Sequence, residues 1–352
     1  MAYTDIDKPS DYFNTVLYTG TESSGKTVTG VGFQPDWIWI KNRTDSSNHN
    51  LYDSVRGGNG TSHYFLKSNT TAAEGTNTSA LLTIDSDGFT LGDGNEVNGS
   101  SDNIVSWNWK AGTSFTNDAS STSVGSIDSA GSVNTDAGFA IITYTGTGSA
   151  ETIAHGLGAT PSFIISRRID GADSWMNWNK SFSATEYLFI NGNGGSYSAS
   201  TVFGTLPTST VYSTGGGTAT GANGGNFISY IFVEKQGYSK FSSYKGNGST
   251  DGTFIYTGFK PAWVMFKRTS GGTSNWTMLD TKRSPHNLMI NEIYANHPNA
   301  ESQNGRDIDC LSNGIKIRSS SAEINGSGDN YTFYAFAENP FVTSTGVPAT
   351  AR

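Results

Sequence analysis

The sequence is poor in cysteine, in charge and in long hydrophobic runs, and each shortage argues against a class of protein. Cys310 is the only cysteine of 352 residues, so no disulfide can form within the chain, and we expect a small buried side chain there. Charged residues make up 15%, and Lys and Arg form no block that could follow a phosphate backbone, which argues against a nucleic-acid partner. No apolar run approaches the roughly 18 residues that cross a bilayer, so we expect no membrane insertion.

Groups that perform catalysis or bind metals are also scarce. The five histidines are scattered, without the spacing of a metal site, and no carboxylate pair has a spacing that supports glycoside hydrolysis. Asp85 and Asp87, together with Asp93 and Glu96, could bind calcium, but a tight turn is the better interpretation because the spacing of a defined loop is missing. We therefore predict no catalytic residue, no metal and no cofactor.

Glycine, small polar residues and aromatics are abundant instead. The 43 glycines suit many tight turns, while 8 Trp, 16 Tyr and 19 Phe are too many for a disordered chain. No segment reads as an amphipathic helix longer than two turns. We predict an all-β protein of short strands, arranged as sandwiches or jelly rolls.

One pattern of residues occurs three times. A Tyr-x-Gly triplet is followed by a glycine and then a proline, with 17 residues from tyrosine to proline in each copy. An internal repeat of this kind sets the architecture, and here it predicts three tandem sandwich units of about 100 residues. The positions of the signature are Tyr18, Gly20, Gly32 and Pro35, then Tyr144, Gly146, Gly158 and Pro161, then Tyr244, Gly246, Gly258 and Pro261.

A strand is predicted directly after each proline, and it ends on a cation. In the first copy Ile38 and Ile40 alternate with Trp37 and Trp39, so both faces are apolar, as in a strand covered on both sides. We expect each proline at the first residue of its strand, where the missing N–H costs least. We expect each cation to emerge at an edge or rim of its sheet; these are Lys41, Arg167 and Lys267.

Each copy closes on an aromatic strand, which fixes the expected boundaries. An asparagine precedes two aromatics by four and six residues, and period two places both rings on one face. The units are 1–111, 138–236 and 238–341, with a Ser/Thr/Gly-rich linker or surface excursion at 112–137 and a tail at 342–352. Because the second and third units are joined closely, we expect them to dock rigidly and the first to be more independent.

Two groups of residues are candidates for contact with a ligand or partner. Asp and Arg three residues apart could bind a carboxylate or an anionic sugar, although an ion pair that anchors a loop is the preferred interpretation. Tryptophans after the cation-ended strands could stack on sugars, although core packing is preferred for them. The candidates are Asp53, Arg56, Asp280, Arg283, Trp175, Trp178 and Trp276.

The runs 8–20 and 30–43, together with 106–112, 144–149 and 155–158, resemble a repeat family of virion proteins in tailed, often marine, bacteriophages. The resemblance covers essentially the whole chain. It implies a concanavalin-like sandwich and a role on the virion surface, as a tail fibre, tail accessory or capsid decoration protein. The second copy departs from the pattern, because Phe163 replaces a tryptophan and the Asp-x-x-Arg pair is missing.

The leading hypothesis from the sequence is a non-enzymatic structural protein of a phage particle, made in the host cytoplasm and displayed on the virion surface. It would assemble as a homo-oligomer, contact other virion proteins and take part in attachment to the host. The alternative is a lectin-like module that recognises a host surface glycan through the three tryptophans. A polysaccharide-degrading enzyme is a more distant alternative.

Overall fold

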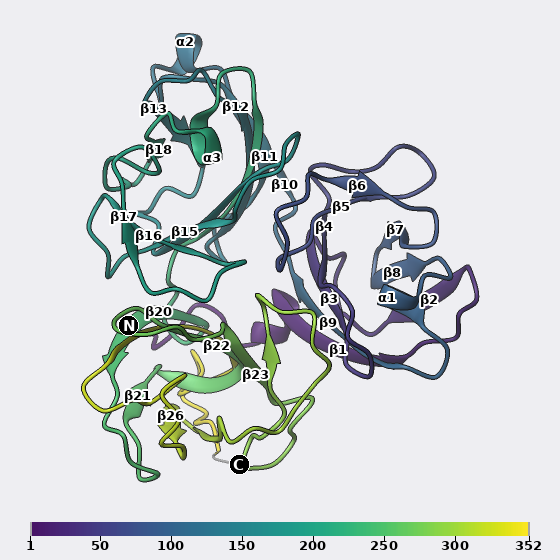
Figure 1. The fold of residues 1–352 in the computed structure, drawn as a ribbon, viewed down its shortest axis with the longest axis vertical. Coiled ribbons are helices and arrows are strands. Elements are labelled where there is room, and N and C mark those ends of the chain that lie inside the picture. Colours follow the sequence, from purple (N-terminus) through teal and green to yellow (C-terminus); the bar gives the residue numbers. More distant parts are fainter. Residues whose placement is uncertain (1, 351–352) are drawn as a thin grey trace.

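A computed structural model of the chain describes residues 2–350 and consists almost entirely of β-strands. Figure 1 shows the strands gathered into three lobes around a common centre, in the order of the chain. The all-β prediction is confirmed, and the sheets pack as sandwiches. We call the strands at 13–109, 113–232 and 239–340 the first, second and third lobes.

The first lobe has a four-stranded antiparallel sheet, in the order β1-β9-β3-β4, and a smaller sheet, β2-β8-β7. A two-stranded pair, β5-β6, lies beside them. The elements are η1 (Pro9–Asp11), β1 (Phe13–Thr19), β2 (Lys26–Thr29), β3 (Trp37–Asn42), β4 (Asn50–Asp53), β5 (Tyr64–Phe65), β6 (Gly75–Thr76), β7 (Leu81–Asp85), β8 (Gly88–Leu91), α1 (Asn95–Asn98) and β9 (Asn103–Trp109).

The second lobe repeats this strand order and extends it. Its large sheet runs β10-β11-β12-β19-β14-β15-β16-β17, and the small sheet is β13-β18. The elements are β10 (Thr113–Asn117), α2 (Ala119–Thr122), β11 (Ser129–Asn134), β12 (Phe139–Thr145), β13 (Glu151–Ala154), β14 (Phe163–Arg168), β15 (Met176–Asn179), β16 (Glu186–Phe189), β17 (Tyr197–Ser198), β18 (Val211–Thr214), α3 (Thr218–Gly221) and β19 (Asn226–Phe232).

The third lobe has a sheet in the order β20-β27-β22-β23-β24 and a smaller sheet, β21-β26-β25. Its elements are β20 (Ser239–Lys245), β21 (Phe254–Tyr256), β22 (Phe259–Arg268), β23 (Thr277–Asp280), β24 (Ile293–Tyr294), β25 (Ile308–Leu311), β26 (Gly314–Ile317) and β27 (Asn330–Pro340). In all three lobes the strand that contains the tyrosine pairs with the closing aromatic strand, which pairs in turn with the strand after the proline.

Residues 112–137 differ from the expected linker. They form β10 and β11 joined through the short helix α2, and β11 pairs with β12 from Ala130↔Thr143 to Asn134↔Phe139. This pairing covers the outer edge of β12, whereas the corresponding edges of β1 and β20 end their sheets. The segment is apolar-poor because an added edge strand has little core to fill.

The strands after the prolines are central, as their two apolar faces predict. β3 lies between β9 and β4, and all six of its residues are buried. The expectation that each proline is the first residue of its strand is wrong: β3 and β14 begin two residues after Pro35 and Pro161. In the third lobe the strand begins earlier, at Phe259, so Pro261 lies inside it. The register shifts on either side of Pro261, which is how a strand accommodates a residue without an N–H.

Each large sheet has a core on both faces. One face packs inside its own lobe, and those three cores are separate clusters. The other face points to the centre of the molecule, where aromatic side chains of all three lobes form one shared core. Trp37 stacks on Tyr230 with ring centroids 4.5 Å apart, and Phe13 stacks on Phe336 at 5.0 Å. The expectation of a more independent first lobe is therefore wrong, because its rings pack against both other lobes.

Candidate functional site

The three signature tyrosines perform one structural task, as the sequence favoured. The hydroxyl groups donate to backbone carbonyls at the end of the lobe: Tyr18 to Val97 at 2.8 Å, Tyr144 to Thr220 at 2.6 Å and Tyr244 to Ile324 at 2.6 Å. Burial raises the pKa of all three hydroxyls well above the ordinary value, so they remain neutral donors.

The signature glycines are required by geometry of two kinds. A Cβ atom on Gly20 would lie 1.9 Å from the carbonyl oxygen of Gly99, so only glycine permits the close approach of the two segments. Gly32, five residues before β3 begins at Trp37, has a φ of 88°, which favours glycine. Its N–H donates to Asp87, which also accepts from Gly30. Asp87 thus closes a turn, the interpretation preferred over a calcium loop.

The cations that end the central strands are buried, not at an edge or rim as expected. Lys41, Arg167 and Lys267 are all 0% exposed. Lys267 donates to the carbonyl oxygens of Asn193 and Ser274, and Arg167 donates to those of Thr71 and Ala72 in the first lobe. Burial lowers the pKa of Lys267 to about 7, that of Lys41 to about 8 and that of Arg167 to about 10. Lys41 donates to the carbonyl oxygens of Asn42 and Asp45 in its own lobe, so of the three cations Arg167 and Lys267 join lobes through backbone carbonyls.

Both Asp-x-x-Arg pairs are buried ion pairs that hold a loop. Nε of Arg56 lies 2.6 Å from Oδ2 of Asp53, and Nε of Arg283 lies 2.5 Å from Oδ2 of Asp280. Each arginine also donates to a backbone carbonyl of the preceding strand, Arg56 to Leu51 at 3.1 Å. The four side chains are at most 4% exposed, so no ligand or partner can reach them.

A closing-strand aromatic of each lobe hydrogen-bonds to a polar side chain on a strand of another lobe (β4, β23 or β15), and together these contacts close a ring. The hydroxyl of Tyr230 in the second lobe donates to Asp53 in the first at 2.8 Å. The indole of Trp107 in the first donates to Asp280 in the third at 3.0 Å. The hydroxyl of Tyr334 in the third donates to Asn177 in the second at 2.9 Å. The second lobe lacks the ion pair and presents amides instead.

A second ring of contacts uses the tryptophans proposed as sugar platforms. The indole of Trp175 donates to the carbonyl oxygen of Lys67 in the first lobe at 2.9 Å, and that of Trp276 donates to Phe189 in the second at 2.8 Å. Both side chains are at most 1% exposed. Trp178 is 3% exposed and belongs to the core of the second lobe. None of the three can stack on a ligand, because neighbouring side chains already cover their rings.

His49 is the residue of this second ring that the sequence analysis missed. It stands four residues before Asp53, as Trp276 stands before Asp280, and that offset is the signal that could have revealed it. Its Nδ1 accepts from the indole of Trp39 at 2.8 Å, so Nε2 carries the proton and lies 2.9 Å from the carbonyl oxygen of Tyr294 in the third lobe. Burial lowers its pKa well below the ordinary value, and the imidazole is neutral.

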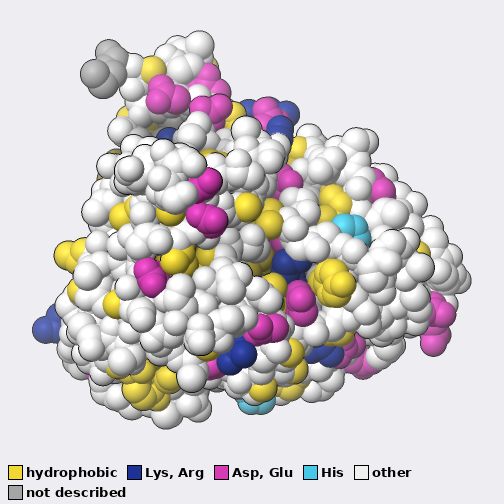
Figure 2. All heavy atoms as spheres, turned by 90° about the horizontal axis from the view of Figure 1, so that it is seen from above, with side chains coloured by type: hydrophobic (Ala, Val, Ile, Leu, Met, Phe, Trp, Pro, Cys, Tyr) yellow, Lys and Arg dark blue, Asp and Glu magenta, His cyan; other side chains and the backbone are white. Residues whose placement is uncertain are grey.

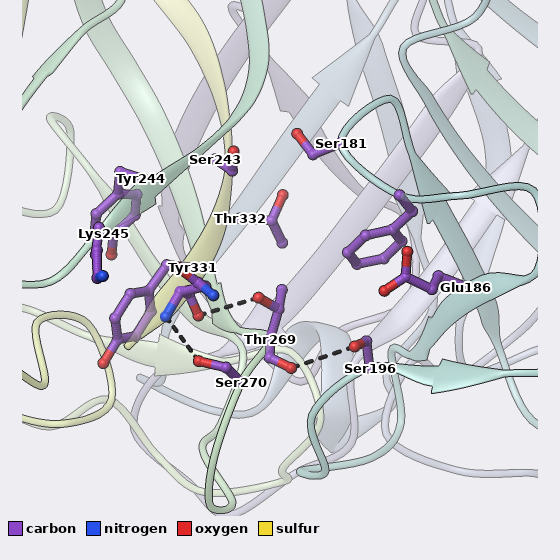
Figure 3. Close-up of a pocket in the computed structure, with 12 residues that line it drawn as sticks. Ser181, Glu186, Ser196, Ser243, Tyr244, Lys245, Thr269, Ser270, Tyr331 and Thr332 are labelled. Carbon is purple, nitrogen blue, oxygen red and sulfur yellow. Dashed lines mark hydrogen bonds between the residues drawn. The ribbon is translucent and has the colours of Figure 1, made fainter. Parts of the chain in front are cut away.

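A groove lies between the second and third lobes, with a volume of about 470 Å³ (Figure 3). One wall comes from the second lobe. The other comes from the third-lobe sheet, on the face that points to the centre of the molecule. Most residues of its lining carry a hydroxyl group, and the others are one acid, one cation, one amide and one phenylalanine. The lining residues are Ser181, Phe182, Glu186, Ser196, Ser243, Tyr244, Lys245, Thr269, Ser270, Asn330, Tyr331 and Thr332.

Figure 2 shows how charged and hydrophobic side chains are distributed on one outer face of the molecule. There, acidic and basic side chains are interspersed, and hydrophobic ones form small groups. Across residues 2–350, no three His, Cys, Asp or Glu side chains gather in a way that could hold a metal ion. Within the same residues, no helix has the length and apolar character needed to cross a membrane.

The comparisons with known proteins identify a family and no activity. No curated protein and no solved structure matches the chain. One family profile matches residues 8–340, and its description is a domain of unknown function, DUF7483. That match spans all three lobes and the shared core between them. The chain therefore belongs to the DUF7483 family.

Proposed function

We propose that the protein is a non-enzymatic structural component of a bacteriophage virion, exposed on the surface of the particle as a tail-fibre or spike tip, a tail accessory protein or a capsid decoration subunit. The observation that carries the proposal is the closed ring of buried contacts, in which the charged and aromatic groups of the repeat join the lobes to one another. The resemblance of the repeats to phage virion proteins supplies the setting.

The ring suits a component that bears load. Tyr230, Trp107 and Tyr334 each reach into the neighbouring lobe, and the shared aromatic core lies between them. A lobe cannot move without exposing those rings and leaving buried polar groups unpaired, which costs about 1–3 kcal/mol for each group. Such a body holds its outer loops at fixed positions, as an attachment or decoration subunit requires.

Mass spectrometry of purified phage particles tests the proposal. We expect peptides of this chain in particles purified through a density gradient, at a copy number that is a multiple of the symmetry of one virion substructure. Antibody labelling viewed by electron microscopy then assigns tail or capsid. Absence of the protein from infectious particles, with abundant protein in the infected cell, would refute the proposal.

Oligomeric state and the absence of enzymatic activity are two further parts of the proposal. We propose a homo-oligomer in contact with other virion proteins, and light scattering of the purified protein at several concentrations measures its state. An enzymatic role is tested by incubation with host surface polysaccharide, where we expect no new reducing ends. A lectin-like role through Trp175, Trp178 and Trp276 is not proposed again, because all three are buried.

A further inference from the structure

We propose that the groove between the second and third lobes binds a neutral oligosaccharide. The proposal does not depend on the virion assignment, since it follows from the shape and chemistry of the groove alone. It also moves the site of recognition away from the buried tryptophans, to residues that no motif in the sequence identified.

The groove has the size and position of a ligand site. Its volume of about 470 Å³ lies within the range of about 300–1,000 Å³ usual for ligand pockets, which often occur where two domains meet. Figure 3 shows Ser181 and Glu186 on one side and Ser243 and Lys245 on the other, with Thr332 between them. A molecule in the groove would contact both lobes at once, and the ring of contacts holds these lobes in place.

The lining offers the hydrogen bonds that sugar hydroxyls need. A sugar hydroxyl both donates and accepts, so it fits a carboxylate acceptor beside donors and hydroxyls. Among the described residues, Glu186 accepts the N–H of Ser183 through Oε2 and no hydrogen bond through Oε1. The Oγ atoms of Ser181 and Ser243 and the Nζ of Lys245, all on exposed residues, make no hydrogen bond within residues 2–350. Phe182, which is half-buried, supplies apolar surface for the face of a sugar ring.

The second lobe provides an internal comparison, because the equivalent groups there are engaged. Thr143, the counterpart of Ser243, donates to the carbonyl oxygen of Ala130 on β11 at 3.0 Å. Thr145, the counterpart of Lys245, donates to the side chain of Asn226 at 3.1 Å. β11 also lines the hollow at this position, which is smaller, about 340 Å³. Within residues 2–350 no strand pairs with the outer edge of β20, so the same surface remains open there.

An oligosaccharide fits the groove better than an extended peptide or an anion. A peptide strand would have to pair with β20, and lysines near both ends, Lys240 and Lys245, are typical of edges protected against such pairing. An anionic ligand would meet the carboxylate of Glu186. A neutral sugar uses Glu186 as an acceptor and Lys245 as a donor without a charge of its own.

Glycan-array binding followed by calorimetry tests the proposal. The purified full chain is applied to an array of bacterial surface oligosaccharides, and the strongest hit is titrated into wild type and variants. Ser243→Trp places a large ring in the groove from an exposed strand position, and Glu186→Gln removes the acceptor charge. We expect at least a hundred-fold loss of affinity for Ser243→Trp and about a ten-fold loss for Glu186→Gln.

Thr143→Trp is the matched control, since it makes the same enlargement at the equivalent position of the second lobe, and we expect its affinity to equal that of wild type. Near-ultraviolet circular dichroism checks that each variant is folded; if Ser243→Trp is not, Glu186→Gln and Asn330→Ala decide.

The proposal is overturned if the wild type binds no oligosaccharide, if the groove variants bind as tightly as wild type, or if a peptide library yields groove-dependent ligands while the array yields none. Each of these outcomes leaves the presence of the protein in virions unaffected, so the two proposals fail separately.

Discussion

The hydroxyl of Tyr230 donates to Oδ2 of Asp53 at 2.8 Å, across the boundary between the second and first lobes. The two residues are 177 positions apart, and both are completely buried. The same carboxylate oxygen accepts from Nε of Arg56. One hydrogen bond thus joins the closing strand of one lobe to the ion pair that anchors a loop of another, and the same arrangement joins Trp107 to the pair of Asp280 and Arg283.

Tyr230→Phe is expected to lower the free energy of unfolding by about 1.5–3 kcal/mol, because it removes a hydrogen bond to a charged group in the interior. Tyr212→Phe is the control. The hydroxyl of Tyr212 donates to Oγ of Ser229 at 2.9 Å within one lobe, and its loss should cost only about 0.5–1.5 kcal/mol. Urea unfolding of both variants measures the difference, and equal losses would contradict a special role for the contact between lobes.

Asp280→Asn is expected to destabilise the protein by about 3–5 kcal/mol, because it leaves the buried guanidinium of Arg283 without its nearest charge partner. The remaining partner, Glu301, lies 2.9 Å from Nη1 of Arg283 and is partly exposed. Asp11→Asn breaks the exposed pair with Lys8 and should change stability by less than about 1 kcal/mol. Thermal unfolding of both variants gives the comparison, and a small effect at Asp280 would show that Glu301 suffices.

The sequence predicted what depends on neighbours along the chain. Period two placed Trp37 and Trp39 on one face of a central strand, and the spacing of Tyr18 and Gly20 marked positions with a structural task. It could not say what covers that face, because the cover is Tyr230 of another lobe. A pattern of neighbouring residues does not indicate which residues far away in the sequence will pack against it.

The burial of the cations and the position of the groove were missed for a related reason. Lys267 donates to backbone carbonyl oxygens such as that of Asn193. Every residue type has a backbone carbonyl, so the sequence does not show which residues accept from a buried lysine. The groove exists because, in the part of the chain that the structure describes, β11 pairs with β12 and no strand pairs with the same edge of β20. A long-range pairing of this kind is decided by tertiary structure.

The stability of the protein is expected to rise with pH above neutrality because of Lys267. Burial lowers the pKa of this residue to about 7, from an ordinary value of 10.5. Between these values the unfolded chain binds more protons than the folded protein, so raising the pH favours folding, by at most about 1.4 kcal/mol per pH unit. The gain is complete above pH 10.5 and absent below about pH 7.

Lys267→Met isolates this contribution. Urea unfolding at pH 7, 8 and 9 should show the free energy of unfolding rising more steeply for wild type than for the variant. Glu323 and Arg268 act on Lys267 as well, and they are present in both proteins. Replacement of the exposed Lys245 by Met should leave the slope of the wild type unchanged. Parallel slopes for wild type and Lys267→Met would show that the buried lysine stays charged throughout.

Gly20→Ala is expected to destabilise the protein far more than Gly25→Ala, although both replace a glycine near the start of the first lobe. A Cβ on Gly20 would lie 1.9 Å from the carbonyl oxygen of Gly99, so two backbone segments must separate, and Tyr18 would lose its position beside Val97. Gly25 has a φ of 85° with nothing within 4 Å of a Cβ, so its replacement costs only the conformational strain, about 1–2 kcal/mol. Thermal unfolding separates the two effects.

We expect Gly20→Ala to lower the free energy of unfolding by more than about 4 kcal/mol, a loss that few mechanisms other than overpacking of the interior produce. A loss no larger than that of Gly25→Ala would mean that the segment ending at Gly99 yields easily, and the signature glycine would then be explained by its turn alone.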